Sequence, residues 1–144
     1  MSTTDALDRY VTAQEGDGTY SGYDTALAEL KDENKSTHWI WYVLPQIDGL
    51  GSSDMCRRYG VRGLQEAKDY LAHPVLGPRL KETVQVLLDA KAPHASDIVG
   101  DGDALKLQSC LTLFHRADPA EPLFTDLLHK YYGGEQDPRT LALL

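Results

Sequence analysis

Three groups of polar side chains have the residue types that acid–base chemistry or anion binding requires. The first group is Asp103, Lys106 and Ser109, which are spaced three residues apart in a segment with helical periodicity. A carboxylate and an amine held close together can transfer a proton or hold a charged substrate. The same spacing also fits an ordinary ion pair near the start of a helix, which contributes little to stability.

The second group lies at the two ends of the most apolar segment, Trp39 to Leu44, which contains both tryptophans, Trp39 and Trp41. His38 precedes this segment and Gln46 follows it. Two buried indoles bring two N–H donors into the interior, and each donor requires a partner. The segment is therefore either the centre of the core or the wall of a pocket that opens at its polar ends, and the sequence leaves both interpretations open.

Arginines form the third group. Arg57, Arg58 and Arg62 lie close together in the sequence, and Arg79 follows a Gly-Pro pair. Because the net charge of the chain is −8, a local group of arginines is unusual in it. A planar guanidinium suits phosphate or carboxylate, so these residues are candidates for an anion clamp. The alternative is that they are solvated charges that balance nearby Asp and Glu.

Several kinds of site and partner are disfavoured by composition and spacing. The five histidines form no His-Glu-x-x-His pair, and Cys56 and Cys110 lack the spacing of a metal site, so neither a metal nor another cofactor is expected. The two cysteines are expected to be small buried side chains of a protein in a reducing cytosol. Nucleic acid is a poor partner for so acidic a chain.

The same survey gives an expected location. No stretch approaches the roughly 20 apolar residues that a membrane helix requires. The first five residues lack the basic and apolar regions of a secretory signal. We therefore expect a soluble, cytoplasmic protein that does not contact a membrane.

The elements that must position these groups are predicted to be helices, because capping residues and prolines recur at expected starts and glycines at expected ends. Ser52 or Ser53 is expected to cap a short helix that runs to Tyr59. Gly133–Gly134 is expected to end a later helix, and Asp137–Pro138 to begin the last one. The pattern predicts an all-α fold, a compact single domain of roughly eight helices that spans residues 1–144.

Other boundaries depend on proline positions. The longest helix is expected to begin at His73–Pro74, and another helix to begin at Asp118–Pro119. The Trp-rich segment is also predicted to be helical, although its residue types favour strands as well. Helical spacing predicts that seven large side chains are buried: Trp39, Trp41, Leu44, Leu80, Leu87, Leu111 and Phe114.

Four ordered motifs, which begin at His38, Leu64, Asp103 and Tyr131, cover nearly the whole chain. Together they resemble a bacterial family catalogued as domain of unknown function 1810, which is sometimes mislabelled calpastatin. The resemblance implies a compact all-helical domain, and no activity is established for the family. This chain departs from the pattern at Ala104, where an acidic residue is common, and at Ser36, where a basic one is common.

One functional hypothesis combines the three polar groups in a cleft beside the Trp-rich segment. The protein would be an enzyme, a hydrolase, or a binder that acts on a small anionic ligand such as a nucleotide or an ADP-ribose-type molecule. An N-glycosidic hydrolase is one such enzyme, and the helical N-glycosidases linked to NAD and ADP-ribose are similar in size. The expected catalytic residues are Asp103, Lys106 and His38. The expected binding residues are Trp39, Trp41, Gln46, Arg57, Arg58, Arg79 and Ser109.

The competing hypothesis is a non-catalytic binding or adaptor protein whose aromatic residues only form the core. The two hypotheses predict different structures. The cleft requires His38, Lys106 and at least one of Arg57, Arg58 and Arg79 to meet at one cavity, with Asp103 and Ser109 near its rim. The adaptor requires scattered polar groups and an exposed apolar patch. The oligomeric state does not follow from the sequence.

Overall fold

Helices form nearly all of the regular structure in the computed structural model, which describes residues 3–16 and 21–144. Within those ranges it contains no strand, and the prediction of an all-α fold is confirmed. The described residues form ten helices where roughly eight were expected, and four of the ten have six residues or fewer. The helices are α1 (Thr3–Glu15), α2 (Tyr23–Lys31), α3 (Ile40–Val43), α4 (Asp54–Tyr59), α5 (Leu64–Ala72), α6 (Leu76–Asp89), α7 (Ala95–Val99), α8 (Asp101–Ala117), α9 (Pro122–Tyr132) and α10 (Pro138–Leu143).

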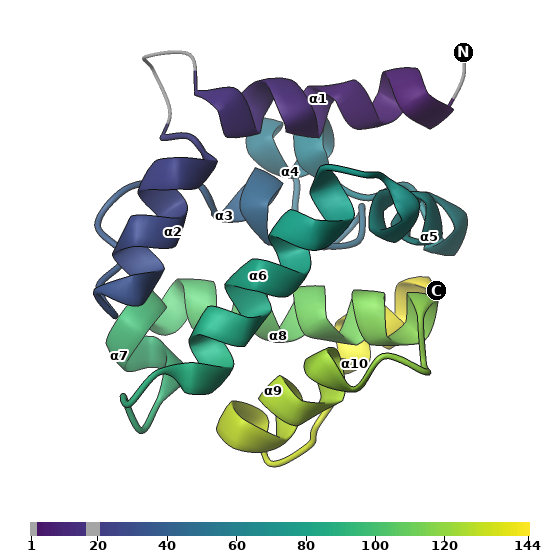
Figure 1. Cartoon of the computed structure of the whole chain (residues 1–144). Coiled ribbons are helices and arrows are strands. Elements are labelled where there is room, and N and C mark those ends of the chain that lie inside the picture. The colour runs from purple at the N-terminus through teal and green to yellow at the C-terminus, as the bar shows by residue number, and fades with distance from the viewer. Residues whose placement is uncertain (1–2, 17–20) are drawn as a thin grey trace.

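Helix α8 is the central element, and it contacts α3, α5, α7, α9 and α10. Figure 1 shows it extending through the lower half of the molecule between α7 and α10. Its buried face is built from Leu107, Cys110, Leu111 and Phe114, which recur at the three- and four-residue spacing of one helix side. This position brings the start of α8, with Asp103 and Lys106, next to the Trp-rich segment.

Aromatic rings connect the upper layer of helices to α8. Helix α1 lies across the top of the molecule, with α4 beneath it (Figure 1). Tyr10 of α1 makes an edge-to-face contact with Tyr70 of α5, at 5.2 Å between ring centroids, and Tyr70 lies 5.2 Å from Phe114 of α8. Pairs of this kind stabilise a core by about 0.5–1.5 kcal/mol beyond the area that they bury.

Several boundaries follow the capping residues that the sequence predicts. Ser53 caps α4, and its side chain accepts a hydrogen bond from the backbone N–H of Cys56 at 3.2 Å. Gly133 ends α9 in the left-handed conformation, with φ of 62°. Asp137 caps α10, and Pro138 occupies the first helical turn. Local signals were sufficient at these three positions.

Two helix starts that were assigned to prolines are wrong. Helix α6 begins at Leu76, because the Nδ1 atom of His73 accepts hydrogen bonds from the backbone N–H groups of Val75 and Leu76 and holds Pro74 in a turn before the helix. It is also not the longest helix, since α6 has 14 residues and α8 has 17.

The second misplaced start is that of α9, which begins at Pro122 rather than at Asp118–Pro119. The backbone N–H of Asp118 donates to the carbonyl of Phe114 and so belongs to the end of α8. Glu121 then takes the N-cap position of α9.

The Trp-rich segment forms only a single helical turn, α3. Six of the seven side chains expected in the core are buried, and the exception is Trp41, which is partly exposed. The neighbouring backbone does not pair into a sheet: Ile47 and Val61 form one isolated parallel bridge. No helix in the described residues is both long enough and apolar enough to cross a membrane.

Candidate functional site

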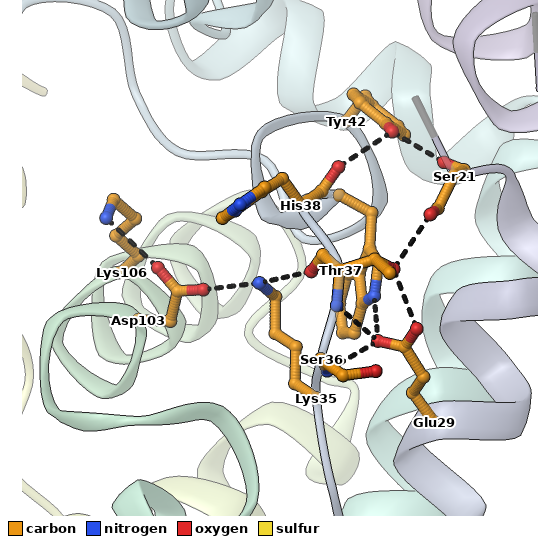
Figure 2. A network of polar contacts seen from close by, with 10 residues as sticks. Ser21, Glu29, Lys35, Ser36, Thr37, His38, Tyr42, Asp103 and Lys106 are labelled. Carbon is orange, nitrogen blue, oxygen red and sulfur yellow. Dashed lines mark hydrogen bonds and ion pairs between the residues drawn. The ribbon is translucent and has the colours of Figure 1, made fainter. Parts of the chain in front are cut away.

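Trp39, at the start of the Trp-rich turn, is held in a fully bonded polar network. Its indole nitrogen donates to the Glu29 carboxylate at 2.9 Å. Glu29 also accepts from the backbone N–H groups of Ser36 and Thr37 and from the Thr37 hydroxyl (Figure 2). Burial acts to raise the pKa of Glu29, but these hydrogen bonds outweigh it and lower the pKa to about 2. This network therefore has a structural function, because its donors and its acceptor are matched.

A second polar cluster joins the same segment to α8. Asp103 accepts from Lys35 at 2.7 Å through one carboxylate oxygen and from Lys106 at 3.0 Å through the other (Figure 2). Burial acts to raise the pKa of Asp103, but the hydrogen bonds and charges of the two lysines hold it below its usual range. Asp103 is therefore ionised at neutral pH, and it is a weak proton acceptor.

A cavity of about 280 Å³ lies beyond Lys106, between the start of α8 and the segment that joins α3 to α4. Its walls are mainly aromatic and aliphatic. The Lys106 ammonium lies 5.6 Å from the centroid of the Trp41 ring, within range of a cation–π interaction. The residues that line the cavity are Trp41, Gln46, Ile47, Leu50, Gly51, Cys56, Tyr59, Gly60, Gly102, Leu105, Lys106 and Arg139.

Two cations, Lys106 and Arg139, face this cavity, and no carboxylate of the described residues lines it. The Lys106 side chain is 31% exposed and that of Arg139 is 58% exposed. The Nε atom of Arg139 lies 3.4 Å from Asp137, which leaves the outer guanidinium nitrogens without a partner among the residues that the structure describes. The cavity therefore offers positive charge beside an apolar surface.

The wall that carries Gln46 is fixed by backbone hydrogen bonds. The N–H of Val61 donates to the carbonyl of Gln46, and the N–H of Asp48 donates to the carbonyl of Val61, each at 2.8 Å. Gly60 permits this approach, because a Cβ atom there would lie 2.6 Å from the carbonyl oxygen of Cys56 and 2.8 Å from the Cα of Asp48. Any other residue at position 60 would push this wall apart.

The structure brings three of the predicted site residues together at the cavity, namely Trp41, Gln46 and Lys106, and Asp103 is joined to them through Lys106. The indole nitrogen of Trp41 is covered and has no partner among the described residues, and Trp41 contributes to the wall of the cavity. His38 is exposed and does not line the cavity. The backbone carbonyl of His38 accepts from the Tyr42 hydroxyl (Figure 2).

The predicted arginines do not reach the cavity. Arg57 is paired with Asp54 at the surface, and Arg58 lies over the Tyr59 ring at 5.4 Å from its centroid. Arg79 borders a separate depression, where it donates to Gln14 and lies over the ring of Tyr23. The expected meeting of His38, Lys106 and one of these arginines is therefore wrong, because the tertiary fold separates them.

Two further residues differ from expectation. Ser109 is fully buried rather than at a rim, and it donates to Asp137 at 2.7 Å, which ties α8 to α10. Arg139 was not among the predicted site residues, although it is the one charged residue of the last helix. A cation one position after a predicted Asp-Pro helix start, in an otherwise apolar helix, was the available signal.

Comparison with known proteins places the chain in a family. The model of a family described as a protein of unknown function, DUF1810, matches residues 4–144, so the chain belongs to this family. The chain is also similar to the conserved hypothetical protein Rv1873 from Mycobacterium tuberculosis, whose crystal structure is known. The two are 45% identical, the match covers 96% of this chain and 95% of that one, and the TM-score is 0.90. A comparison with curated proteins found no match.

Proposed function

We propose that this protein binds a small anion with a planar ring, such as a mononucleotide, in the cavity beside Trp41. The ring would lie against Trp41 and Tyr59, and the anionic group would lie between Lys106 and Arg139. One observation carries the proposal: two cations lie beside aromatic and aliphatic walls in the same cavity, and none of the described residues that line it has a carboxylate. Guanidinium and ammonium groups beside apolar surface are well suited to bind phosphate or carboxylate.

The size of the cavity limits the ligand. Its volume of about 280 Å³ is slightly below the roughly 300–1,000 Å³ that is typical of small-molecule pockets. A mononucleotide or a smaller aromatic anion suits such a cavity better than a whole ADP-ribose molecule, of which one half would remain outside. Binding of a larger molecule would therefore use the cavity for one end only.

The geometry supports binding more than hydrolysis. A general base needs a pKa near the working pH, whereas Asp103 is held below its usual range by two lysines. His38 does not line the cavity. An N-glycosidic hydrolase at this site would therefore need a base other than these two residues.

One observation favours the adaptor as a second candidate. The large hydrophobic side chains that are exposed in the described part of the chain lie on α8 or at the C-terminal end: Leu105, Leu141, Leu143 and Leu144. Leu105 and Leu141 border one shallow depression. An exposed apolar surface of this kind is typical of a protein contact.

Thermal unfolding with a panel of nucleoside monophosphates tests the first candidate, with the uncharged nucleosides as matched ligands. At 100 times its Kd, a ligand stabilises a protein by about 2.7 kcal/mol, or about 10 °C for a chain of this size. We expect a monophosphate to raise the Tm more than its nucleoside, and Lys106→Met and Arg139→Gln to remove the difference. Arg57→Gln is the matched control, because Arg57 is exposed and outside the cavity.

A panel without any stabilising member would reject the proposal. The adaptor would then be preferred, and Leu105→Ser with Leu141→Ser provides its own test. Light scattering of the wild type and of this double variant measures self-association. A complex that the double variant loses supports the leucine surface as a contact site.

A further inference from the structure

We infer that Lys35 makes the cavity electrostatically positive, although Lys35 does not line it. Lys35 neutralises Asp103, and the charge of Lys106 therefore remains available to an anion. The inference deepens the proposed binding function and rests on it for its biological meaning. Lys35 is thus a positioning residue: it acts on the ligand through Asp103 and Lys106.

Lys35 is a buried cation whose ammonium group has several close partners. Its side chain is 6% exposed. The ammonium contacts Asp103 at 2.7 Å, donates to the carbonyl of Thr37 at 2.7 Å and lies 5.0 Å from the centroid of the Trp39 ring. A buried ammonium requires this many partners, so the position of its charge is well defined.

A count of charges shows what Lys35 contributes. Lys35, Asp103 and Lys106 together carry one net positive charge, and Lys106 is the member that faces the cavity. Without Lys35, Asp103 and Lys106 form a neutral pair, and the carboxylate holds the ammonium more strongly. An anion would then meet only the charge of Arg139, which is itself next to Asp137.

Cys56 provides a probe of this charge that does not depend on the natural ligand. Cys56 is a partly exposed residue of the cavity wall, whereas Cys110, the other cysteine, is fully buried and burial raises its pKa. Iodoacetate and iodoacetamide alkylate a thiolate by the same displacement of iodide, but only iodoacetate is negatively charged. The ratio of the two rates therefore reports the local potential, and any change in the thiolate population cancels.

We expect Lys35→Met to lower the ratio of the iodoacetate rate to the iodoacetamide rate by about twofold, the order of magnitude that one unit charge within a Debye length produces at an effective dielectric constant of about 80. Asp103→Asn should raise the ratio by a similar factor. The double variant Lys35→Met/Asp103→Asn should restore the wild-type ratio, because it again leaves one net positive charge. Lys35→Arg should preserve the ratio.

Restoration by Asp103→Asn separates a charge effect from a structural one, since a structural defect at Lys35 would persist. Lys68→Met is the matched control, because Lys68 is an exposed lysine of α5 outside the cavity, and its ratio should not change. In about 1 M salt, where the Debye length is about 3 Å, the differences should disappear.

An unchanged ratio in folded Lys35→Met overturns the inference. If Lys35→Met does not fold, an unchanged ratio in Asp103→Asn overturns it equally. The proposed binding function is tested separately. If the ratio changes as expected but no nucleoside monophosphate stabilises the protein, the charge of the cavity is correctly assigned and the class of ligand is wrong.

Discussion

Trp39 and Trp41 differ in almost every respect, although one residue separates them. Trp39 is fully buried, and its N–H is bonded to Glu29. Trp41 is partly exposed, its N–H has no partner in the described part of the chain, and its ring lines a cavity beside a lysine. Of the two interpretations of the Trp-rich segment, the core is therefore correct for one indole and the pocket wall describes the other.

The physical reason is the single turn of α3. Trp39 is the N-cap residue that precedes α3, with φ of −145°, and Trp41 is the second residue of the helix, so the two side chains leave the turn in different directions. Trp39 points to α2, which supplies Glu29, and Trp41 points to the start of α8. The matched hydrogen-bond network around Trp39 stabilises the fold, whereas the partly open ring of Trp41 lies beside the partly exposed cation Lys106 and is available for the proposed contact with a ligand.

The largest difference between the two tryptophans should be in stability. Trp39→Ala should reduce the free energy of unfolding by about 3–5 kcal/mol, since it creates a large cavity and removes a donor from Glu29. Trp41→Ala should cost only about 1–2 kcal/mol, because part of this ring is already exposed. Urea denaturation measures both values, and equal losses would contradict the distinction.

The next effect concerns the carboxylate that holds Trp39. Glu29→Gln should reduce the free energy of unfolding by about 1–3 kcal/mol, because a neutral amide replaces an anion that accepts four hydrogen bonds. Chemical denaturation at neutral pH measures this value. A variant as stable as the wild type would show that the network contributes nothing net.

Glu29 should also produce a pH dependence. The pKa of Glu29 is lowered in the folded state from 4.5 to about 2, so the unfolded chain binds the proton more tightly. The stabilisation is therefore complete above pH 4.5, and it is lost as the pH falls towards 2. Denaturation measured between these two pH values should show that the free energy of unfolding falls less for Glu29→Gln than for the wild type. An equal fall in both proteins would show that Glu29 does not cause the pH dependence.

On the cavity side, substitutions should affect binding without affecting the fold. Lys106→Met and Arg139→Gln should each change the free energy of unfolding by less than about 1 kcal/mol, because partly exposed ion pairs contribute little. Thermal unfolding without ligand provides this measurement. A loss comparable with that of Glu29→Gln would assign these cations to the structure rather than to a site.

The smallest effect is spectroscopic. In Trp41→Phe the remaining indole, Trp39, should be protected from both iodide and acrylamide. In Trp39→Phe the remaining indole, Trp41, should be quenched by both reagents. Iodide should quench it more strongly, relative to neutral acrylamide, than exposure alone would produce, because Lys106 attracts anions. Quenching constants that are equal in the two variants would remove the distinction between core and wall.

The sequence was most informative where a structure depends on neighbouring residues. Gly133 and the Asp137–Pro138 pair were placed correctly, and Ser53 was one of the two caps expected for α4, because caps and prolines act over three or four residues. Pro74 misled the assignment, because the His73 side chain satisfies the first N–H groups of α6 from outside the helix. No periodicity reveals such a contact.

The site was less predictable than the fold, because its residues come from distant segments. Lys106 and Gln46 were expected at the site as polar residues next to apolar segments, and both of them line the cavity. The same argument wrongly included Arg79, because the sequence does not show that Gln14 and Glu15 of α1 surround its guanidinium. Arg139 was not expected at the cavity, because it is a single arginine near the C-terminal end rather than a member of a cluster in the sequence.

The backbone bridge between the Gln46 and Val61 segments has a consequence for the kinetics of the proposed ligand binding. Because hydrogen bonds within the protein hold this wall, and Gly60 lets the two chain segments approach each other, the cavity is formed in the absence of a ligand. The protein should therefore become little more ordered when a ligand binds, and the rate of association should be set by the diffusional encounter of ligand and protein. We expect the observed rate in stopped-flow fluorescence to rise linearly with ligand concentration, without the plateau that a slow rearrangement imposes.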